Sequence, residues 1–172
     1  MEYTDLILSR VSLRNYDPDR PVPKDTLIKI LDAGRVAPSA VNYQPWKFLV
    51  VSSPSMLDKV KACYHRDWFK DAPHVLIVTG LSDQAWVRSI DGHNSIETDA
   101  AIAMTHLILE AENEGVGTCW IENYNPGMLR EALDLNDNQL IFGITPLGYP
   151  KAGYQKPSEK KRKSLEEIAE FL

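Results

Sequence analysis

The sequence has few cysteines, no long apolar run and no excess of positive charge. Cys63 and Cys119 lie far apart and lack the CxxC or Cys/His spacing of a metal site, so we expect reduced thiols and no bound metal. The formal net charge of −5 argues against a general nucleic-acid binder, whose affinity depends on neutralising phosphates. No stretch approaches the roughly twenty apolar residues that cross a bilayer, and the first ten residues lack the layout of a signal peptide. We therefore expect a cytoplasmic protein with neither a nucleic-acid nor a membrane partner.

What the sequence does contain is typical of one folded domain over residues 1–172. An apolar fraction of 44% and a charged fraction of 25% are those of an ordinary globular protein, and no internal repeat interrupts the chain. Hydrophobic periodicity predicts helices and strands in alternation. The expected helices lie near residues 4–9, 23–37, 54–64, 97–114 and 126–133, and the expected strands at 47–53, 74–80, 117–123 and 140–150.

The stretch APSAVNYQPWKFLVV, residues 37–51, connects a helix to a strand through a polar loop. Pro38 disfavours helical geometry at the residue before it, so the helix should end there. Prolines and polar residues then turn the chain before a run of β-branched and aromatic residues begins. A polar loop pinned between a helix and a core strand is a suitable place to hold a ligand, although many such loops only connect.

A second candidate site lies near the start of the chain. Arg10, Ser12 and Arg14 are spaced two apart, so in an extended segment all three side chains project to the same side. Two guanidiniums and a hydroxyl suit a phosphate or another oxyanion. The alternative is a solvated basic edge without a ligand, and the spacing alone leaves both open.

Two further segments bear on assembly and on the pocket. The helix expected at 97–114 is apolar over more than a narrow stripe, which is typical of a helix at the centre of a core or buried by a second subunit. Residues 81–96 show no sustained period and predict a connection of the kind that often covers a site. Trp86 within it either covers a pocket or packs the connection onto the body. No nucleophile-elbow or histidine-rich metal motif is present.

Five segments carry more information together than any one of them. They are, in chain order, SRVSLRNYD, APSAVNYQPWKFLVV, DAAIAMTHLILEAENEGVGTCWIENYNP, PLGYP and KKRKSLEEI. Their order and spacing, over nearly the whole chain, resemble the nitroreductase family of flavoenzymes. The resemblance implies an α+β fold with a central mixed β-sheet flanked by helices, in an intertwined homodimer with FMN at the interface.

The same resemblance assigns FMN-binding roles to residues from four parts of the chain. It implies that Arg10 and Ser12 hold the phosphate or ribityl chain, and that Arg14 lies near the pyrimidine ring, where a cation stabilises reduced flavin. It places Arg162, together with Lys160 or Lys163, in a late basic motif that completes the phosphate site. The loop residues that it assigns to the other subunit's flavin are Pro38, Ser39, Ala40 and Asn42, and the residues at its reactive face are Glu122 and Asn123.

The chain also departs from the family pattern. Many members carry two small residues where this chain has Glu122 and Asn123, so the bulkier pair is expected to narrow the pocket or change its polarity. A side-chain amide that contacts the flavin in some relatives has no clear counterpart, and His65 is the nearest candidate. The residues that we name as candidates to line the acceptor pocket, each of which could equally be ordinary packing, are Tyr43, His65, Trp68, Trp86 and Tyr124.

By resemblance, the expected activity is an FMN-dependent oxidoreductase. It would take two electrons from NADH or NADPH and pass them, in ping-pong order, to a nitroaromatic, a quinone or another electron-poor small molecule. No catalytic side chain is assigned, since the flavin performs the chemistry. The alternative is a flavin-binding storage or electron-relay protein without NAD(P)H turnover.

Overall fold

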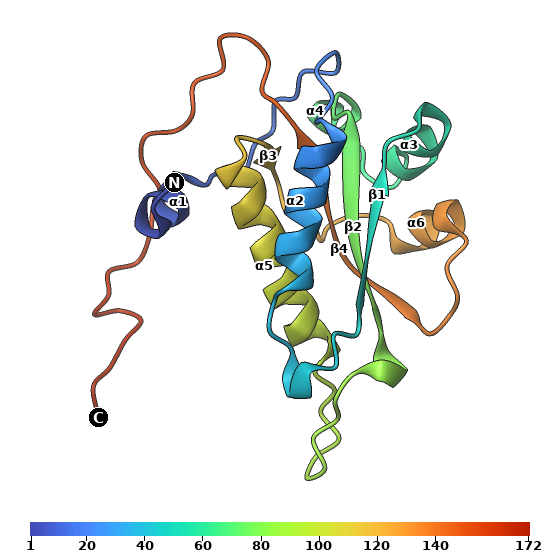
Figure 1. Ribbon diagram of the computed structural model, residues 1–172, viewed down its shortest axis with the longest axis vertical. Coiled ribbons are helices and arrows are strands. Elements are labelled where there is room, and N and C mark those ends of the chain that lie inside the picture. Colours follow the sequence, from blue (N-terminus) through green and yellow to red (C-terminus); the bar gives the residue numbers. More distant parts are fainter.

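Four antiparallel strands form one sheet in the order β1-β2-β4-β3 (Figure 1). The computed structural model describes residues 1–172. Helices cover both faces of the sheet, so the α+β class is confirmed, and parallel pairing is limited to one isolated bridge between Ser12 and Thr118. The strands are β1 (Trp46–Val51), β2 (His74–Leu81), β3 (Gly117–Thr118) and β4 (Gln139–Gly148), and the helices are α1 (Tyr3–Ser9), α2 (Lys24–Arg35), α3 (Pro54–Lys61), α4 (Asp67–Lys70), α5 (Ile96–Asn113) and α6 (Pro126–Leu133).

Strand β2 lies at the centre of the core because its apolar run is buried on both faces, as its sequence predicts. Leu76 and Val78 pack against α2 and α5, whereas Val75 and Ile77 pack against the layer that contains α3, α4 and α6. Alternate residues of a strand point to opposite faces, so one strand supplies both cores. None of the helices has the length and apolar content that crossing a bilayer requires.

Helix α5 is the long apolar helix that the sequence predicts, and α2 packs closely along it. A Cβ atom at Gly34 of α2 would lie 2.7 Å from the Leu107 side chain, so only glycine permits this approach. Helix α5 ends one residue before the sequence expectation, and Gly115 follows with a φ of 73°, the left-handed geometry of a helix C-terminus. The turn at Gly115 then leads directly into β3.

Strand β3 is shorter than the sequence predicts, because its ladder with β4 is interrupted. Thr118 pairs with Leu147, and Ile121 pairs with Ile144 three residues later in the same register. That register sets Cys119 opposite Pro146, which has no N–H to donate. The Cys119 N–H donates instead to Thr145 Oγ1, at 3.0 Å. The expected strand at 117–123 is therefore a two-residue strand followed by a single bridge.

Two segments extend beyond the packed layers (Figure 1). Residues 85–95 form a narrow hairpin, with a bridge between Val87 and Asn94, where the sequence predicts only a connection. The C-terminal arm, residues 155–172, has no helix or strand and passes α1 on its way from the body. Three of its apolar side chains, Leu165, Ile168 and Phe171, are 65%, 67% and 97% exposed.

His74 joins the start of β2 to two other segments and makes stability depend on pH. Its Nε2 accepts a hydrogen bond from the Val22 N–H at 3.0 Å, so Nδ1 carries the proton and faces Ser52 Oγ at 2.8 Å. Burial lowers the pKa of His74 from its ordinary 6.5, and the Lys61 charge lowers it further.

We expect the His74 contribution to stability to be complete above about pH 6.5 and to decrease as the pH falls below it. The unfolded chain binds the proton that folded His74 resists, so the free energy of unfolding decreases on acidification. In urea unfolding between pH 5 and 8, the free energy of unfolding of His74→Gln should change less with pH than that of the wild type. His93→Gln, which changes an exposed histidine, should retain the wild-type dependence. Equal slopes for the two variants would contradict this role.

Candidate functional site

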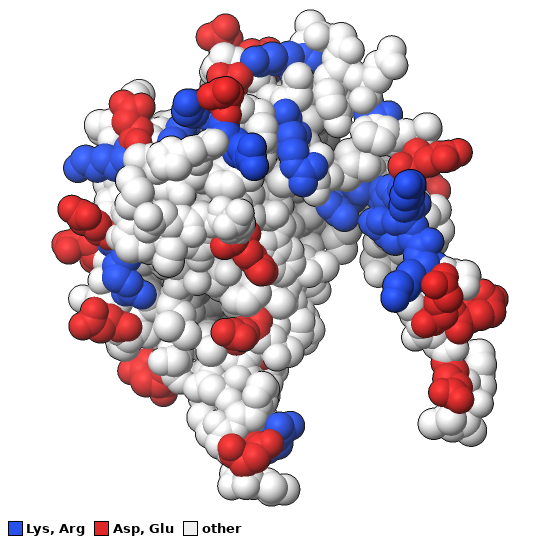
Figure 2. Space-filling model, turned by 180° about the vertical axis from the view of Figure 1, so that it is seen from behind, with Lys and Arg blue, Asp and Glu red and all other residues white.

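Three basic residues from the two ends of the chain meet beside α1, and we call Arg10, Lys160 and Arg162 the basic cradle. Burial lowers the pKa of Lys160, and the Arg10 and Arg162 charges lower it further. Lys160 Nζ donates to the carbonyl oxygen of Ile7 at 3.0 Å, and none of the three residues forms an ion pair with a carboxylate. Figure 2 shows basic side chains gathered where the C-terminal arm leaves the body.

Arg10 and its neighbours lie on an extended segment, as their spacing predicts. The bridge from Ser12 to Thr118 holds this segment beside β3. Leu13 is buried, whereas Arg14 is exposed on the alternate side. Burial raises the pKa of the Cys119 thiol, while the Arg14 charge and a hydrogen bond with Ser12 act in the opposite direction. The bridge therefore holds the segment that carries Arg10, Ser12 and Arg14 beside β3.

The loop after α2 has unusual backbone geometry. Val41, Asn42 and Gln44 have φ values of 53°, 60° and 53°. Left-handed geometry is rare for a β-branched residue such as Val41, and such strain persists only where the surroundings impose it. Ser39 Oγ accepts from the Gln44 N–H at 2.9 Å and closes the loop. Strained backbone of this kind is concentrated at functional sites, which agrees with a ligand-binding role for residues 38–42.

Asp99 in the first turn of α5 anchors this loop. Its carboxylate is 2% exposed and accepts from the Ala40 N–H at 2.8 Å and from Ser95 Oγ at 2.7 Å. The positive end of the helix dipole favours a carboxylate at this position. The sequence reasoning missed Asp99, because one acidic residue near a helix N-terminus is usually solvated.

The basic cradle and the loop occupy opposite ends of α5 (Figure 1). Asp99 holds the loop at the start of the helix, and Glu112, in its last turn, contacts α1 through Ser9. The two carboxylates are thirteen helical positions apart, which corresponds to a rise of about 20 Å along the axis. The structure therefore does not bring Pro38, Ser39, Ala40 and Asn42 to the basic cradle of their own chain.

Glu122 and Asn123 are exposed and follow the bridge at Ile121. Glu122 lines a cavity of about 300 Å³ together with residues of β4 and the first turn of α5, among them Ile96 and Phe142. Within one chain, Glu122 thus borders the end of α5 that holds the loop. Two carboxylates, Glu97 and Glu122, make this cavity acidic.

The structure assigns two of the five pocket candidates to packing. Trp68 is half-buried, and the centroid of its ring lies 6.2 Å from that of Tyr16 and 6.2 Å from that of Phe69. Tyr124 packs against the core on the α6 face and donates to the Ile141 carbonyl at 3.1 Å, and burial raises its pKa. Because this packing occupies both side chains, we do not carry them into the proposed acceptor site.

The other three candidates have free surface but do not form one pocket. Tyr43 is 56% exposed in the strained loop, and His65 is exposed just before α4. Trp86 is half-buried at the base of the hairpin, where its carbonyl accepts from the Ser95 N–H at 2.9 Å. Tyr43 and Trp86 therefore lie toward the α5 end that carries Asp99, and His65 lies on another part of the fold.

Comparison with known proteins identifies the family to which this fold belongs. The model of the nitroreductase family matches residues 7–63 and 55–149. A protein of Methanothermobacter thermautotrophicus, which carries the provisional name NADH dehydrogenase/NAD(P)H nitroreductase, is 33% identical over 87% of this chain and 78% of its own length. A nitroreductase family protein of Clostridium difficile 630 superposes with a TM-score of 0.91 at 32% identity, over 99% of this chain and 98% of its own.

A third relative connects the fold to a cofactor. The FMN-dependent nitroreductase of Clostridium difficile R20291 has a TM-score of 0.72 and 26% identity, over 95% of this chain and 92% of its own. The matched residues include the extended segment, the strained loop and the sheet described above. From the family match and the shared fold, the chain belongs to the nitroreductase family.

Proposed function

We propose that this chain is an FMN-dependent oxidoreductase that takes two electrons from NADH or NADPH and passes them, in ping-pong order, to an electron-poor small molecule. The observation that carries the proposal is the basic cradle, where three cations converge without a carboxylate ion pair in a chain of net charge −5. Like charges held together are stabilised by a bound anion. The phosphate of FMN has the charge and the acceptor oxygens that these groups require.

The residues present fit FMN in other respects. Arg10, Lys160 and Arg162 would hold its phosphate, and Ser12, on the same extended segment as Arg10, would bind the ribityl chain. Arg14 would set a positive charge near the pyrimidine ring. When bound, FMN supplies the two-electron chemistry, and the acidic cavity beside Glu122 is the proposed location of the acceptor, a nitroaromatic, quinone or similar compound.

A homodimer completes this site in our proposal. The loop residues Pro38, Ser39, Ala40 and Asn42 lie at the opposite end of α5 from the basic cradle of their own chain (Figure 1), so the loop of a second copy would approach the flavin instead. The exposed apolar side chains of the C-terminal arm, Leu165, Ile168 and Phe171, support an intertwined arrangement, because they have no cover within one chain. Sedimentation should show a dimer, and a monomer that retains tightly bound FMN would contradict the shared site.

The test of function is the colour of the purified protein and its response to nucleotide. We expect a yellow protein whose flavin absorbance bleaches when NADH or NADPH is added without oxygen, and recovers when an acceptor such as a quinone follows. A protein that is yellow but never bleaches would show a flavin-binding module without NAD(P)H turnover. A colourless protein that takes up no added FMN would contradict both functions.

Arg14→Ala is expected to bind FMN more weakly and to lower its two-electron reduction potential. Arg14 is exposed beside the extended segment and forms no ion pair, so its charge is available to a ligand. Loss of a cation near reduced flavin removes stabilisation of its negative charge. Potentiometric titration measures the reduction potential. Arg66→Ala is the control, because it removes an exposed arginine just before α4 and should leave the potential unchanged. An unchanged potential and affinity would remove Arg14 from the site.

A further inference from the structure

We propose that Glu112 is a positioning residue that joins the two ends of the chain, so that the basic cradle is assembled before the ligand binds. The inference rests on the proposed function, because it takes the phosphate of FMN as the anion that the basic cradle holds. Glu112 lies in the last turn of α5, and neither its sequence context nor the family resemblance singles it out.

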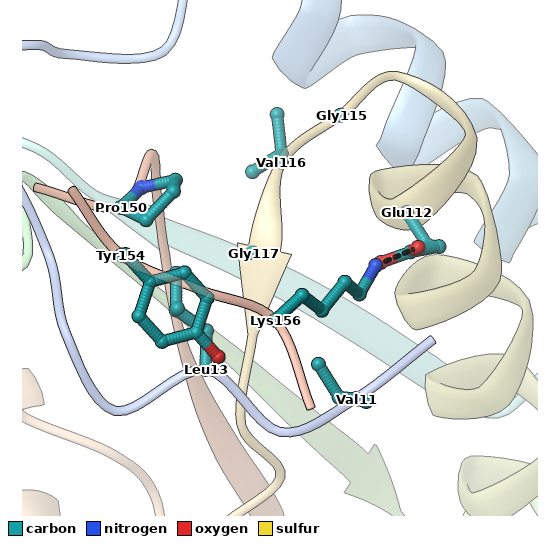
Figure 3. Close-up of a pocket in the computed structure, with 9 residues that line it drawn as sticks. All are labelled: Val11, Leu13, Glu112, Gly115, Val116, Gly117, Pro150, Tyr154 and Lys156. Atoms are coloured by element: carbon teal, nitrogen blue, oxygen red, sulfur yellow. Dashed lines mark hydrogen bonds and ion pairs between the residues drawn. The ribbon is translucent and has the colours of Figure 1, made fainter. Parts of the chain in front are cut away.

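Glu112 contacts both chain ends through a single carboxylate oxygen. Its Oε1 accepts a hydrogen bond from Ser9 Oγ at 2.7 Å and from Lys156 Nζ, which also forms an ion pair with it (Figure 3). The Glu112 side chain is only 11% exposed, whereas Lys156 is 41% exposed. Hydrogen bonds to a charged and largely buried acceptor are stronger than those between neutral groups.

The two donors stand directly next to the basic cradle. Ser9 is the last residue of α1 and precedes Arg10, and Lys156 lies four residues before Lys160. Lys160 Nζ in turn donates a hydrogen bond to the Ile7 carbonyl on α1. This bond closes a ring of contacts that runs from α5 through the arm to α1. Removing Glu112 would open this ring and leave Lys160 and Arg162 on an arm with one side-chain contact to α1.

Packing does not replace this link. Between the extended segment, the turn at Gly115 and the arm there is a cavity of about 270 Å³, lined by Val11, Leu13 and Tyr154 among others (Figure 3). Val11 and Leu13 face it because they alternate with Arg10, Ser12 and Arg14, which project to the other side. The arm therefore spans a gap, and its contact with Glu112 lies at the rim of that gap.

The sign of the effect separates positioning from simple electrostatics. Glu112 is a negative charge close to Lys160, so its field alone repels a phosphate. If Glu112 acted only through its charge, Glu112→Ala would bind FMN more tightly. If Glu112 holds the arm and α1 together, the same substitution weakens binding despite the gain in positive charge. The two roles predict opposite directions.

The experiment measures FMN affinity by fluorescence titration of the full-length protein after removal of bound flavin. We expect Glu112→Ala to weaken FMN binding about tenfold, because the hydrogen bonds that Glu112 accepts from Ser9 and Lys156 no longer hold the arm and α1 together. Glu112→Gln keeps an acceptor for both donors and should recover part of the loss. Glu114→Ala is the matched control. Glu114 lies two residues after Glu112, just past the end of α5, and pairs with Lys29 at 2.9 Å, so its removal should leave the affinity unchanged.

A double-mutant cycle with Lys156→Ala completes the test. Because either substitution breaks the same link, the double variant should lose less affinity than the product of the two single losses. Unchanged or tighter binding by Glu112→Ala, or losses that multiply, would overturn the proposal. A lower melting temperature with unchanged FMN affinity would overturn it too, because Glu112 would then be only structural. Wild-type protein that binds no FMN would overturn the proposed function. If the wild type binds FMN but the Glu112 variants do not behave as expected, only the role of Glu112 is overturned.

Discussion

Replacing Arg10 and Arg162 together with alanine is expected to weaken FMN binding by roughly 10²-fold to 10⁴-fold. Each guanidinium can donate a hydrogen bond to the charged phosphate, and such a bond is worth about 1.5 to 3 kcal/mol. A tenfold change in affinity corresponds to about 1.4 kcal/mol. The two residues flank Lys160, whose pKa their charges lower. Removing them also relieves repulsion in the absence of a ligand, so the flavin-free variant should melt no lower than the wild type.

The control removes the same charge from elsewhere on the surface. Arg35 and Arg88 each pair with an aspartate of their own segment, at 2.6 Å and 2.7 Å, and lie outside the basic cradle. The double variant Arg35→Ala/Arg88→Ala therefore has the same net charge as the Arg10/Arg162 variant. Isothermal titration with FMN compares the two. Similar losses in both variants would show that total charge, and not the basic cradle, determines affinity.

Asp99→Ala is expected to reduce the free energy of unfolding by about 2 to 5 kcal/mol and to abolish tight FMN binding. The substitution leaves the Ala40 N–H and the Ser95 hydroxyl without their acceptor, at about 1 to 3 kcal/mol for each buried group. It also releases the loop in which Val41 has a φ of 53°, and an unanchored loop would relax toward commoner geometry. Urea unfolding and FMN titration measure the two effects.

Two variants separate the anchor from general effects on α5. Asp99→Asn keeps one oxygen for the Ala40 N–H, so it should retain more stability and more FMN affinity than Asp99→Ala. Glu97→Ala removes an exposed acidic residue from the same first turn and tests the helix dipole alone, worth about 0.3 to 1 kcal/mol. If Glu97→Ala lost as much stability as Asp99→Ala, the loop contact would not be the cause.

Much of the fold follows from local patterns in the sequence. The apolar run of β2 predicts burial on both faces, and Gly115 predicts the end of α5, because both signals lie within the element concerned. The length of β3 does not follow, since the interruption depends on Pro146 of another strand. The alternation of Arg10, Ser12 and Arg14 leaves an anion site and a solvated basic edge both open. The spacing does not show that Lys160 and Arg162 lie near Arg10, which is expected only from the family resemblance and depends on contacts between the two ends of the chain.

The residues that the sequence reasoning missed share a physical reason. Asp99 and Glu112 are acidic residues on a helix, and such residues are usually solvated. Each owes its role to partners that are distant in the chain: Ala40 lies 59 residues from Asp99, and Ser9 lies 103 residues from Glu112. Trp68 illustrates the opposite difficulty, because an aromatic side chain suits a pocket and a core equally well, and the sequence does not show that its neighbours are the rings of Tyr16 and Tyr64.

The contact between Lys160 and α1 closes a loop of 153 residues in the chain. During synthesis, Arg10 leaves the ribosome before the sheet, whereas Lys160 and Arg162 leave it after the whole sheet and all six helices. The layered body can therefore fold while the basic cradle is still incomplete, and the basic cradle is the last part to form. For the same reason, a protease that cuts within the exposed residues 161–172 would leave a folded body that has lost part of this site.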